Sequence, residues 1–362
     1  MAILVLNAGS SSLKFAVHDA ASLARLAGGQ VSGIGTAAML ALDGQKPVSC
    51  DAATPAAALE PVITALMELG HSDFDAVGHR MVHGGSHFTA PVVVDDGALA
   101  ALEALRALAP LHLPFGLSVL RGTRRLLPQA RHVACFDTAF HATQPEMATR
   151  LPLPRSYFDK GYRRYGFHGL NYEHGASPLP AAGNRPTPCP GACWRPIWGR
   201  GLPCAPFWGA SVATTMGFST ADGLVMGTRT GSIDPGVLVA LMRDEGLTLN
   251  QLEDLLYRKS GLLGLSGLSG DMRTLLASSD PHAAEAVDYY CHSVARHGAA
   301  LAAAMGGIDA IVFTGGVGEN AAPVRARVME LMGWLKIPTV HVIAANEELT
   351  IARHTSRLSR GQ

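Results

Sequence analysis

The sequence predicts a globular α/β protein with its functional site at the ends of its strands. Several apolar segments of strand length end in turns that carry glycine or aspartate, and segments of helical period lie between them. Ligands of open α/β sheets bind where strands end. The 362 residues suffice for roughly two to three domains with large cores.

Composition excludes several other classes of protein. Lys plus Arg and Asp plus Glu number 29 each, so no charge excess favours a nucleic-acid partner. No apolar run reaches the roughly 18–20 residues of a membrane span, and no basic region precedes the apolar start of the chain. Six cysteines in a chain of this length do not form a disulfide scaffold. We therefore expect a cytoplasmic enzyme with no nucleic-acid or membrane partner.

The N-terminal part of the chain alternates predicted strands and helices. The turn Asn7–Ser12, rich in Gly and Ser, joins the first two strands as a hairpin. Gly70 and Pro110 follow segments of helical spacing and end them. We expect strands at Ile3–Leu6, Leu13–His18, Ala76–Val82 and His132–Phe136, and helices at Ala56–Leu69 and Ala98–Leu108.

The C-terminal part continues the alternation. Pro323 opens a predicted helix and Gly333 follows its end, which is the usual placement of these two residues. We expect helices at Leu247–Leu256, His282–Met305 and Pro323–Met332, and strands at Ala310–Thr314 and Thr339–Ile343.

The segment Gly175–Gly209 has a different composition. It holds eight of the 22 prolines, three of the six cysteines and three of the four tryptophans, but no Asp, Glu or Lys. No helical or strand period survives its prolines. Its cysteine spacing, without a nearby histidine, is poor for zinc, and its tryptophans argue against a disordered linker.

Two glycine-bearing motifs are suited to phosphate groups. Asn7–Lys14 (NAGSSSLK) places backbone N–H groups, three hydroxyls and a lysine on the hairpin tip, although the spacing of a Walker A loop is absent. An ordinary polar turn is the alternative. Phe313–Asn320 (FTGGVGEN) is a strand followed by a glycine-rich turn into a helix, where a backbone can approach a nucleotide closely.

Charged residues mark further candidate positions. Arg80 lies in an apolar strand, where it either binds a carboxylate or phosphate or forms a structural salt bridge. Asp137 at a strand end either faces Mg²⁺ or a nucleophile, or caps a helix. His168, between Phe and Gly, is either functional or structural. Arg229 is a second arginine in a glycine-flanked stretch.

Taken together, the motifs resemble the acetate kinase family in content and order. The matching stretches extend over most of the chain and are NAGSSSLKF, VGHRMVHGG, LAPLHLP, FDTAFHATQPE, YRRYGFHG, TTMGF, DGLVMGTRTGSIDPG, SGLLGLSGLSGDMR, FTGGVGEN and ANEELTIAR. Related acyl kinases such as propionate kinases share nearly all of them.

The resemblance implies a fold and an activity. Members have two domains built on a duplicated ribonuclease H-like, actin-like ATPase core, with the active site in the interdomain cleft. They transfer a phosphoryl group between ATP and acetate with Mg²⁺, giving ADP and acetyl phosphate, and form homodimers. We expect an N-terminal domain at residues 1–140, to which the tail 348–362 returns, and a nucleotide-binding domain at residues 141–347.

The resemblance also implies site residues. Catalytic roles fall to Arg80, His112, Asp137, His168 and Arg229, and an acyl pocket to Val82, Leu111, Phe167 and Thr220. ATP contacts fall to Ser10, Ser12, Lys14, Asp271, Met272, Arg273, Gly315, Gly316, Gly318 and Asn320, and Mg²⁺ contacts to Asn7 and Glu347. The chemistry fits these residue types. Acetate is ionised at neutral pH and needs no general base, only charge cancellation and in-line positioning.

The segment Gly175–Gly209 departs from the family, which has a loop H-L-G-N-G-x-S there that embraces the ATP phosphates. Back-translation of Cys193–Gly199, read one nucleotide earlier, permits V-L-A-A-H-L-G, and Arg200–Cys204 then permits x-G-A-S-L. Only the family's asparagine cannot be encoded. We interpret the segment as the product of two compensating frameshifts, near His174–Ser177 and Trp208–Ser211. An independently evolved insert is the alternative.

A second departure follows Trp334. The family has a further stretch before its last strand, whereas here Leu335–Pro338 leads almost directly into Thr339–Ile343. We interpret this as a deletion that affects a helix-to-strand connection more than the chemistry.

Several functions remain open from the sequence. Thr220 stands where many members have Pro or Ala, and one methylene in an apolar pocket is worth only about 1–3 kcal/mol. An acetate kinase, a propionate or other short-chain acyl kinase, and a catalytically impaired relative that lacks the second phosphate loop are therefore all candidates. A sugar kinase on the same core would not explain paired arginines beside a small apolar pocket.

Overall fold

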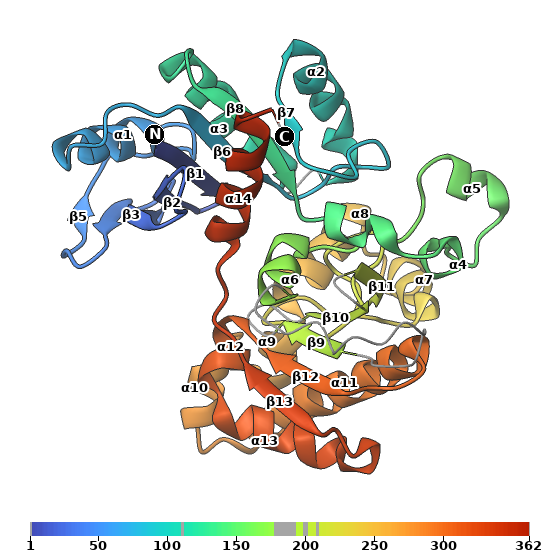
Figure 1. Cartoon of the computed structure of the whole chain (residues 1–362). Helices are drawn as coiled ribbons and strands as arrows, with labels where there is room; N and C mark the ends of the chain where they lie inside the picture. Colours follow the sequence, from blue (N-terminus) through green and yellow to red (C-terminus); the bar gives the residue numbers. More distant parts are fainter. Residues whose placement is uncertain (1, 110–111, 177–192, 198–201, 208–209, 362) are drawn as a thin grey trace. The chain divides into compact units, whose positions relative to one another are not determined.

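The protein forms two compact units, seen in a computed structural model that describes residues 2–109, 112–176, 193–197, 202–207 and 210–361 (Figure 1). Unit 1 comprises Met1–Phe140, Phe167–His174 and Asn346–Gln362, and unit 2 comprises His141–Gly166 and Gly175–Ala345. The sequence-based division placed residues 167–174 and 346–347 in the second domain, whereas the structure groups them with unit 1.

Unit 1 is built on a sheet with the strand order β5-β4-β3-β2-β1-β6-β8-β7. Strands β1 to β5 form antiparallel pairs, β6 runs parallel to β1 and to β8, and β7 pairs antiparallel with β8. The strands are β1 (Ala2–Ala8), β2 (Ser12–Asp19), β3 (Arg25–Ser32), β4 (Met39–Leu42), β5 (Val48–Ser49), β6 (Ala76–Met81), β7 (Val92–Val93) and β8 (Arg131–Phe136).

Helices cover both faces of the unit 1 sheet, because side chains alternate between the faces along each strand. Leu4 and Leu6 of β1 belong to one buried cluster, which contains residues of α1 (Leu59–Glu68) and α3 (Leu113–Leu126). Ile3 and Val5 belong to another cluster, which contains Leu170 of α6 (Gly169–Ala176) and Ile351 of α14 (Glu347–Ser359). The remaining helical elements are α2 (Asp96–Ala104) and the 3-10 turn η1 (Leu105–Leu108).

Unit 2 repeats the core topology of unit 1. Its sheet has the order β11-β10-β9-β12-β13, with β9 parallel to β12, β12 parallel to β13, and β10 antiparallel to both β9 and β11. These directions and this order match β3-β2-β1-β6-β8. The strands are β9 (Cys193–Ile197), β10 (Leu202–Phe207), β11 (Ala210–Thr214), β12 (Ala310–Phe313) and β13 (Thr339–Val342). The duplicated α/β core implied by the resemblance is confirmed.

The helices of unit 2 pack around its sheet, and α11 contributes nine buried residues to the unit. The elements are α4 (Glu146–Thr149), α5 (Arg155–Asp159), α7 (Pro235–Arg243), α8 (Leu249–Asp254), α9 (Gly261–Ser266), α10 (Met272–Ala277), α11 (Pro281–Met305), α12 (Gly315–Asn320) and α13 (Ala322–Leu331), with short turns η2 (Ala139–Thr143), η3 (Leu255–Lys259) and η4 (Gly333–Leu335). Within the parts of the chain that the structure describes, no helix is both long and apolar enough to cross a bilayer.

The segment Gly175–Gly209 shows no strand period in its sequence, yet the structure has strands in it. Strands β9 and β10 lie there and pair with each other, although each contains proline. Pro196 stands opposite Pro203, which suits an antiparallel pair that exchanges no N–H···O bonds. On its other side, β9 pairs with β12 only at Cys193 and Trp194 among the described residues. This pairing therefore does not need the backbone N–H that Pro196 lacks.

Other predicted elements are confirmed with small shifts at their ends. Gly70 adopts a positive φ of 85° directly after the end of α1, as a helix C-cap glycine does. The predicted helix Ala98–Leu108 tightens into the 3-10 turn η1 from Leu105. The predicted glycine-rich turn after β12 is itself helix α12, which begins at Gly315.

Candidate active site

Arg80 and Asp137 form the centre of a polar cluster in unit 1, at the ends of the parallel strands β6 and β8. Arg80 Nη2 donates to Asp137 Oδ2 at 2.6 Å, and its Nε donates to both carboxylate oxygens at 3.1 and 3.2 Å. The side chain of Asp137 is 1% exposed and that of Arg80 is 17% exposed. The sequence left Asp137 open as a helix N-cap, but its carboxylate binds this guanidinium.

Asn7 and Glu347 complete the cluster from the first strand and the last helix. Arg80 Nη1 donates to Asn7 Oδ1 at 3.0 Å, and Asn7 Nδ2 donates to Glu347 Oε2, also at 3.0 Å. Arg80 Nε lies 3.7 Å from the same Glu347 oxygen. Glu347 is held there because Asn346 caps α14, its side chain accepting from the N–H of Leu349 at 3.0 Å.

The guanidinium of Arg80 retains capacity for an anion. A guanidinium has five N–H donors, and those directed at acceptors within the described residues are its Nε–H, one on Nη1 and one on Nη2. Two N–H groups therefore remain on a side chain that is partly exposed. The salt-bridge and anion-binding interpretations of Arg80 are compatible, because the pair with Asp137 orients the guanidinium.

Burial and neighbouring charges shift the pKa values of this cluster. Burial raises the pKa of Asp137 to about 6, against the lowering effect of Arg80. Burial would also raise the pKa of Glu347, but the charges of Arg80, His168 and Lys14 lower it overall. The pKa of Arg80 is raised, since the carboxylates outweigh its desolvation. The cluster thus holds a fixed cation beside two carboxylates.

His168 reaches this cluster through an uncommon backbone conformation. Its φ is +59°, a region that non-glycine residues rarely adopt and that concentrates at functional sites. Its N–H donates to the Asp137 carboxylate, and its ring contributes charge at Glu347. Gly169 donates to the carbonyl of Asp137 at 2.8 Å. A Cβ at Gly169 would lie 2.3 Å from that carbonyl oxygen, so only glycine allows this approach.

The other predicted unit 1 residues lie at several positions. Ser10 lies in the turn between β1 and β2, whereas Ser12 and Lys14 lie on β2. His112 precedes α3, and Val82 follows β6. Phe167 is buried, with its ring 5.6 Å from that of His83 at an interplanar angle of 74°. Leu111 lies outside the described residues.

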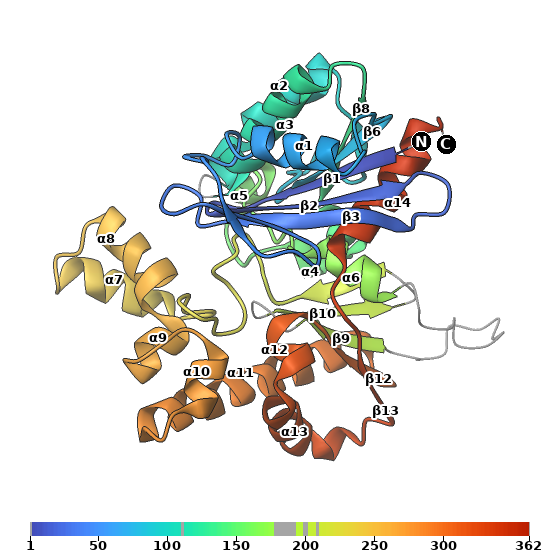
Figure 2. The ribbon, with the colours of Figure 1, turned by 90° about the vertical axis from the view of Figure 1, so that its left-hand side faces the viewer.

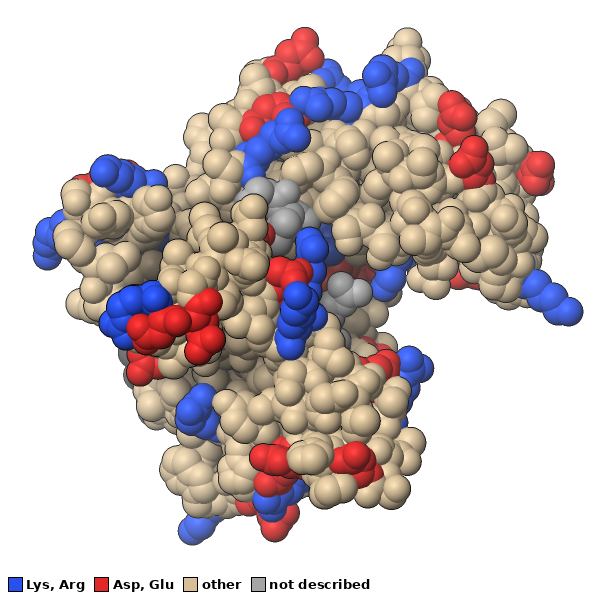
Figure 3. Space-filling model, turned by 180° about the vertical axis from the view of Figure 1, so that it is seen from behind, with Lys and Arg blue, Asp and Glu red and all other residues tan. Residues whose placement is uncertain are grey.

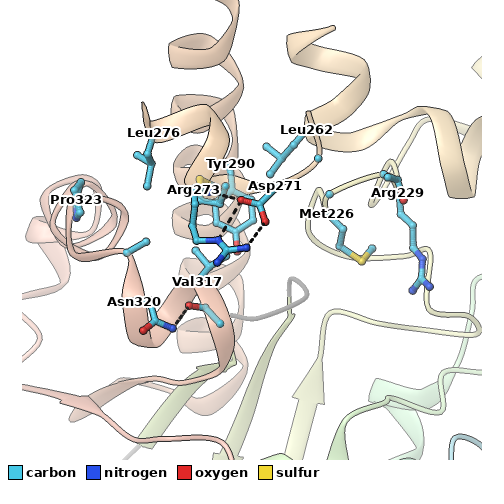
Figure 4. Close-up of a pocket in the computed structure, with 16 residues that line it drawn as sticks. Met226, Arg229, Leu262, Asp271, Arg273, Leu276, Tyr290, Val317, Asn320 and Pro323 are labelled. Atoms are coloured by element: carbon cyan, nitrogen blue, oxygen red, sulfur yellow. Dashed lines mark hydrogen bonds and ion pairs between the residues drawn. The ribbon is translucent and has the colours of Figure 1, made fainter. Parts of the chain in front are cut away.

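Unit 2 contains a cavity of about 760 Å³, which is in the size range of small-molecule sites. Figure 4 shows Asp271 and Arg273 facing it from the start of α10, opposite Asn320 and Val317 of α12. Asp271 caps α10 and pairs with Arg273 at 3.1 Å, and Asn320 Nδ2 donates to the Gly316 carbonyl at 2.8 Å. The structure thus brings together five predicted ATP residues: Asp271, Met272, Arg273, Gly316 and Asn320.

Arg229 lines the same cavity, and its Nη1 donates to the Thr220 carbonyl at 3.2 Å. Its guanidinium also lies 5.7 Å from the ring centre of Tyr257. Arg229 and Thr220 thus belong to unit 2, whereas Arg80 belongs to unit 1. Gly315 and Gly318 share α12 with Gly316 but are not among the residues that line the cavity.

Sequence reasoning missed the apolar walls of the cavity. Leu262, Leu276 and Tyr290 line it from α9, α10 and α11. Their sequence signal is only the apolar period of a buried helix, which does not distinguish a cavity wall from a core residue. The resemblance assigned Asn7 and Glu347 to one Mg²⁺ site, and the structure adds their direct hydrogen bond across 340 residues of sequence.

Comparison with known proteins matches this arrangement to one family. The model of the acetokinase family matches residues 2–357. The chain belongs to the acetokinase family. The acetate kinase of Rhodopseudomonas palustris (strain TIE-1) is 40% identical, and the match covers 99% of this chain and 98% of that protein. The acetate kinase of Nitrobacter hamburgensis is 43% identical, over 98% of this chain and 96% of that protein.

Solved structures give the same family. An acetate kinase of Porphyromonas gingivalis superposes with a TM-score of 0.88 at 33% identity, over 99% of both chains. A propionate kinase of Francisella tularensis superposes with a TM-score of 0.90 at 31% identity, over 98% of this chain and 99% of that one. The match to the R. palustris protein spans 397 positions, more than the 362 residues here, so family relatives carry residues that this chain lacks.

Proposed function

We propose that the protein transfers a phosphoryl group between ATP and acetate, forming ADP and acetyl phosphate. Two features support this: family membership and the two unused N–H donors of Arg80 beside Asp137. The observation that carries the proposal is the Arg80 cluster. A rigidly held guanidinium recognises a carboxylate or phosphate through two parallel hydrogen bonds.

The cluster suits the charge problem of this reaction. Acetate is ionised at neutral pH, so attack on the phosphoryl group requires no base. An anion must instead approach a polyanion, which favours preorganised cations. In the proposal the reacting oxygens are bound by Arg80, Arg229 and His168. His112 faces the transferring phosphoryl group beside them. Asp137 keeps Arg80 oriented by its two-oxygen contact.

Lys14, Ser10 and Ser12 are the proposed phosphate contacts of the first hairpin. Asp271, Met272, Arg273, Gly316 and Asn320 are the proposed contacts of the nucleoside, because they line one cavity of suitable size. We further propose that Gly315 and Gly318 act by keeping α12 free of bulky side chains near the phosphates.

The residues present fit Mg²⁺, which prefers oxygen ligands and commonly uses one or two carboxylates together with substrate phosphates. Glu347, Asn7 and Asp137 offer two carboxylates and an amide in one hydrogen-bonded cluster. No group of three or more His, Cys, Asp or Glu side chains in the described parts could hold a metal alone. When bound, Mg²⁺ would neutralise charge on the phosphates. Glu347 and Asn7 are the residues proposed to hold it.

Charge on the surface is consistent with a small anionic substrate bound by local groups. Figure 3 shows Lys and Arg in small groups interspersed with Asp and Glu, separated by larger areas of other residues. The formal net charge is zero. Recognition of acetate and ATP is therefore assigned to the buried cluster and the cavity rather than to a basic face.

The test is turnover of purified protein with ATP, Mg²⁺ and acetate, with acetyl phosphate trapped as the hydroxamate. We expect acetate-dependent product and ADP in equal amounts. ADP release without acyl phosphate, or no ADP with any short-chain acid, would overturn the proposal. Lys46→Gln is the control and is purified in the same way. Lys46 lies on the surface loop after β4 and is far in sequence from the Arg80 cluster.

Propionate is the second candidate acyl substrate. The propionate kinase of F. tularensis is a full-length structural neighbour. The proposed acyl pocket of Val82, Leu111, Phe167 and Thr220 is apolar except for Thr220, and one methylene changes binding by only about 1–3 kcal/mol. Comparing kcat/KM for acetate and propionate decides between the two.

An impaired kinase is the other alternative, and the fold gives it a specific basis. Strands β9 and β10 of unit 2 correspond in order and direction to β1 and β2 of unit 1, and residues 198–201 between them lie outside the described residues. The family's H-L-G-N-G loop is absent from that connection. Sequencing the gene across the codons for Tyr172 to Thr215 tests the frameshift interpretation. We expect one inserted and one deleted base. If the present codons are confirmed, the interpretation fails.

A cytoplasmic homodimer completes the proposal. Helix α7 has no buried residue, and Val239 and Met242, three positions apart on one side of the helix, are 58% and 44% exposed. Exposed apolar side chains that share one side of a helix suit contact with a second copy. Sedimentation of the protein and of Met242→Glu checks this: we expect a dimer that the substitution weakens, and a monomeric native protein would contradict it.

A further inference from the structure

His354 and Glu173 join two helices whose first residues carry active-site groups. His354 Nε2 donates to Glu173 Oε2 at 2.9 Å, across 181 residues of sequence. Glu173 lies on α6, which follows His168 directly, and His354 lies on α14, which begins at Glu347. Figure 2 shows α6 beside α14. Neither Glu173 nor His354 is among the site residues that the sequence predicts.

The two helix starts are themselves tied to the Arg80 cluster. The start of α6 is held through His168 and Gly169, whose N–H groups donate to the carboxylate and carbonyl of Asp137. The start of α14 is held through Glu347, which accepts from Asn7. The charge of the His168 ring acts on Glu347. The relative position of α6 and α14 therefore sets the position of His168 with respect to Glu347.

The hydrogen bond adds a directional contact to the apolar packing of the two helices. Leu170 of α6 and Ile351 and Ala352 of α14 belong to one buried cluster with strand residues of β1, β6 and β8. Apolar contacts are non-directional. The hydrogen bond between His354 and Glu173 is directional, and the His354 side chain is only 13% exposed. It therefore adds a directional constraint on the register of the two helices.

We infer that Glu173 and His354 are positioning residues for the phosphoryl-transfer reaction, because their hydrogen bond sets the register of α6 against α14. This rests on the proposed function. Neither residue touches substrate. A displacement of about 1 Å of a catalytic group can cost about 10²-fold in rate, so a partial loosening of two groups is expected to cost about tenfold in kcat.

The test is a charge exchange. Glu173→Lys and His354→Asp are made singly and together. Each single variant is expected to lower kcat about tenfold and to change the KM for ATP less than kcat, because the proposed nucleoside contacts line a cavity in unit 2. The double variant restores an attractive pair in the reverse sense and is expected to recover most of kcat.

A matched control separates positioning from general loss of stability. Arg25 Nη2 and Asp43 Oδ2 lie 2.7 Å apart in unit 1 and join the start of β3 to the turn after β4, away from the proposed catalytic residues. Asp43→Asn is expected to leave kcat within twofold of the native value. Equal kcat losses in Asp43→Asn and Glu173→Lys, or no recovery in the double variant, would overturn the inference.

Amide hydrogen exchange supplies a readout that does not depend on turnover. The N–H groups of Tyr172 and Leu349 report the first turns of α6 and α14. We expect faster exchange at both in each single variant and native exchange in the double variant. Unchanged exchange in the single variants overturns the inference. If the native protein shows no kinase activity, the proposed function fails while the exchange data still decide the positioning role.

Discussion

At the scale of single residues, Arg80 shows how one side chain can satisfy both interpretations that a sequence leaves open. Its apolar strand context indicated either a structural pair or an anion site. The structure pairs it with Asp137 and Asn7 and still leaves two donors unused among the described contacts. A buried ion pair lends little net stability. Its value here is orientation, which a fixed guanidinium needs to bind a planar anion.

Arg80→Lys is expected to lower kcat/KM for acetate by about 10²–10³-fold. An ammonium group keeps the charge that Asp137 requires, but it cannot reach Asp137, Asn7 and a substrate oxygen with a planar fork. Steady-state kinetics over a range of acetate concentrations measure the change. Arg25→Lys is the control, because Arg25 forms an exposed pair with Asp43 in the same unit. Native kcat/KM in Arg80→Lys would contradict the anion-binding role.

His83 provides a pH-dependent term in stability. The Gly85 N–H donates to His83 Nδ1 at 2.8 Å, and burial lowers the pKa of His83 to about 4. The unfolded chain has a histidine pKa near about 6.5. The unfolded state therefore takes up the proton first, and stability that is complete above about pH 6.5 is lost as the pH falls toward 4. The loss attributable to this group amounts to about 3 kcal/mol.

We expect His83→Gln to show a shallower decline of the unfolding free energy than the native protein between pH 6.5 and 4. Glutamine can still accept from Gly85 but does not titrate. Urea unfolding at a series of pH values gives both slopes. Parallel slopes for the two proteins would show that His83 does not contribute to the acid instability.

At the scale of elements, the parallel strands of each unit end in turns that carry aspartate or glycine, and this much is predictable. Asp137 follows β8, Gly84 lies shortly after β6, and Gly315 lies shortly after β12. The strands in Gly175–Gly209 were missed because proline normally stops a ladder. The structure accommodates these prolines because Pro196 and Pro203 stand opposite each other and because the ladder between β9 and β12 is short. Neither pairing can be read from the sequence.

Gly78 fixes how closely α14 packs on β6. A Cβ at Gly78 would lie 2.4 Å from Thr355 Oγ1 and 2.5 Å from Ile351 Cγ2. Gly78→Ala is therefore expected to push α14 outward and to destabilise the protein by about 1–3 kcal/mol. Because α14 carries Glu347, kcat should fall as well. Thermal unfolding and turnover of the same preparation measure both effects.

Gly97→Ala is the matched control for that substitution. Gly97 lies in the first turn of α2, and a Cβ there would meet only the Asp95 side chain at 3.4 Å, an ordinary contact. Alanine is favoured over glycine in a helix by about 0.5–1 kcal/mol, so we expect unchanged or slightly higher stability. A Gly78→Ala protein as stable and active as Gly97→Ala would refute the packing argument.

At the scale of the whole molecule, the two units carry different parts of the proposed chemistry. The Arg80 cluster belongs to unit 1 and the nucleoside cavity to unit 2. The repeated strand order gives β1 and β2 of unit 1 their counterparts in β9 and β10 of unit 2.

Binding of the nucleoside part of ATP is expected to depend on the cavity of unit 2. Leu276→Trp adds volume to the cavity wall and should weaken ATP binding at least about tenfold, a difference of about 1.4 kcal/mol. Leu268→Trp is the control, because Leu268 is 49% exposed and does not line the cavity. Calorimetric titration measures both. Equal ATP affinity in the two variants would exclude this cavity as the nucleoside site.

The sequence by itself determined the α/β class, the hairpin that begins with Asn7, and the family, because strand and helix periods and contiguous motifs are local signals. The assignment of Asp271, Met272 and Arg273 together to the ATP site was possible for the same reason, because they are consecutive in the sequence. The resemblance already assigned Asn7 and Glu347 to one site and returned the C-terminal tail to the N-terminal domain. Tertiary structure decided which side chains touch: Asn7 donates to Glu347, and Glu173 contacts His354, because α14 packs on the sheet of unit 1. The physical reason is that hydrogen bonds depend on distance in space, and no local period encodes contacts across hundreds of residues.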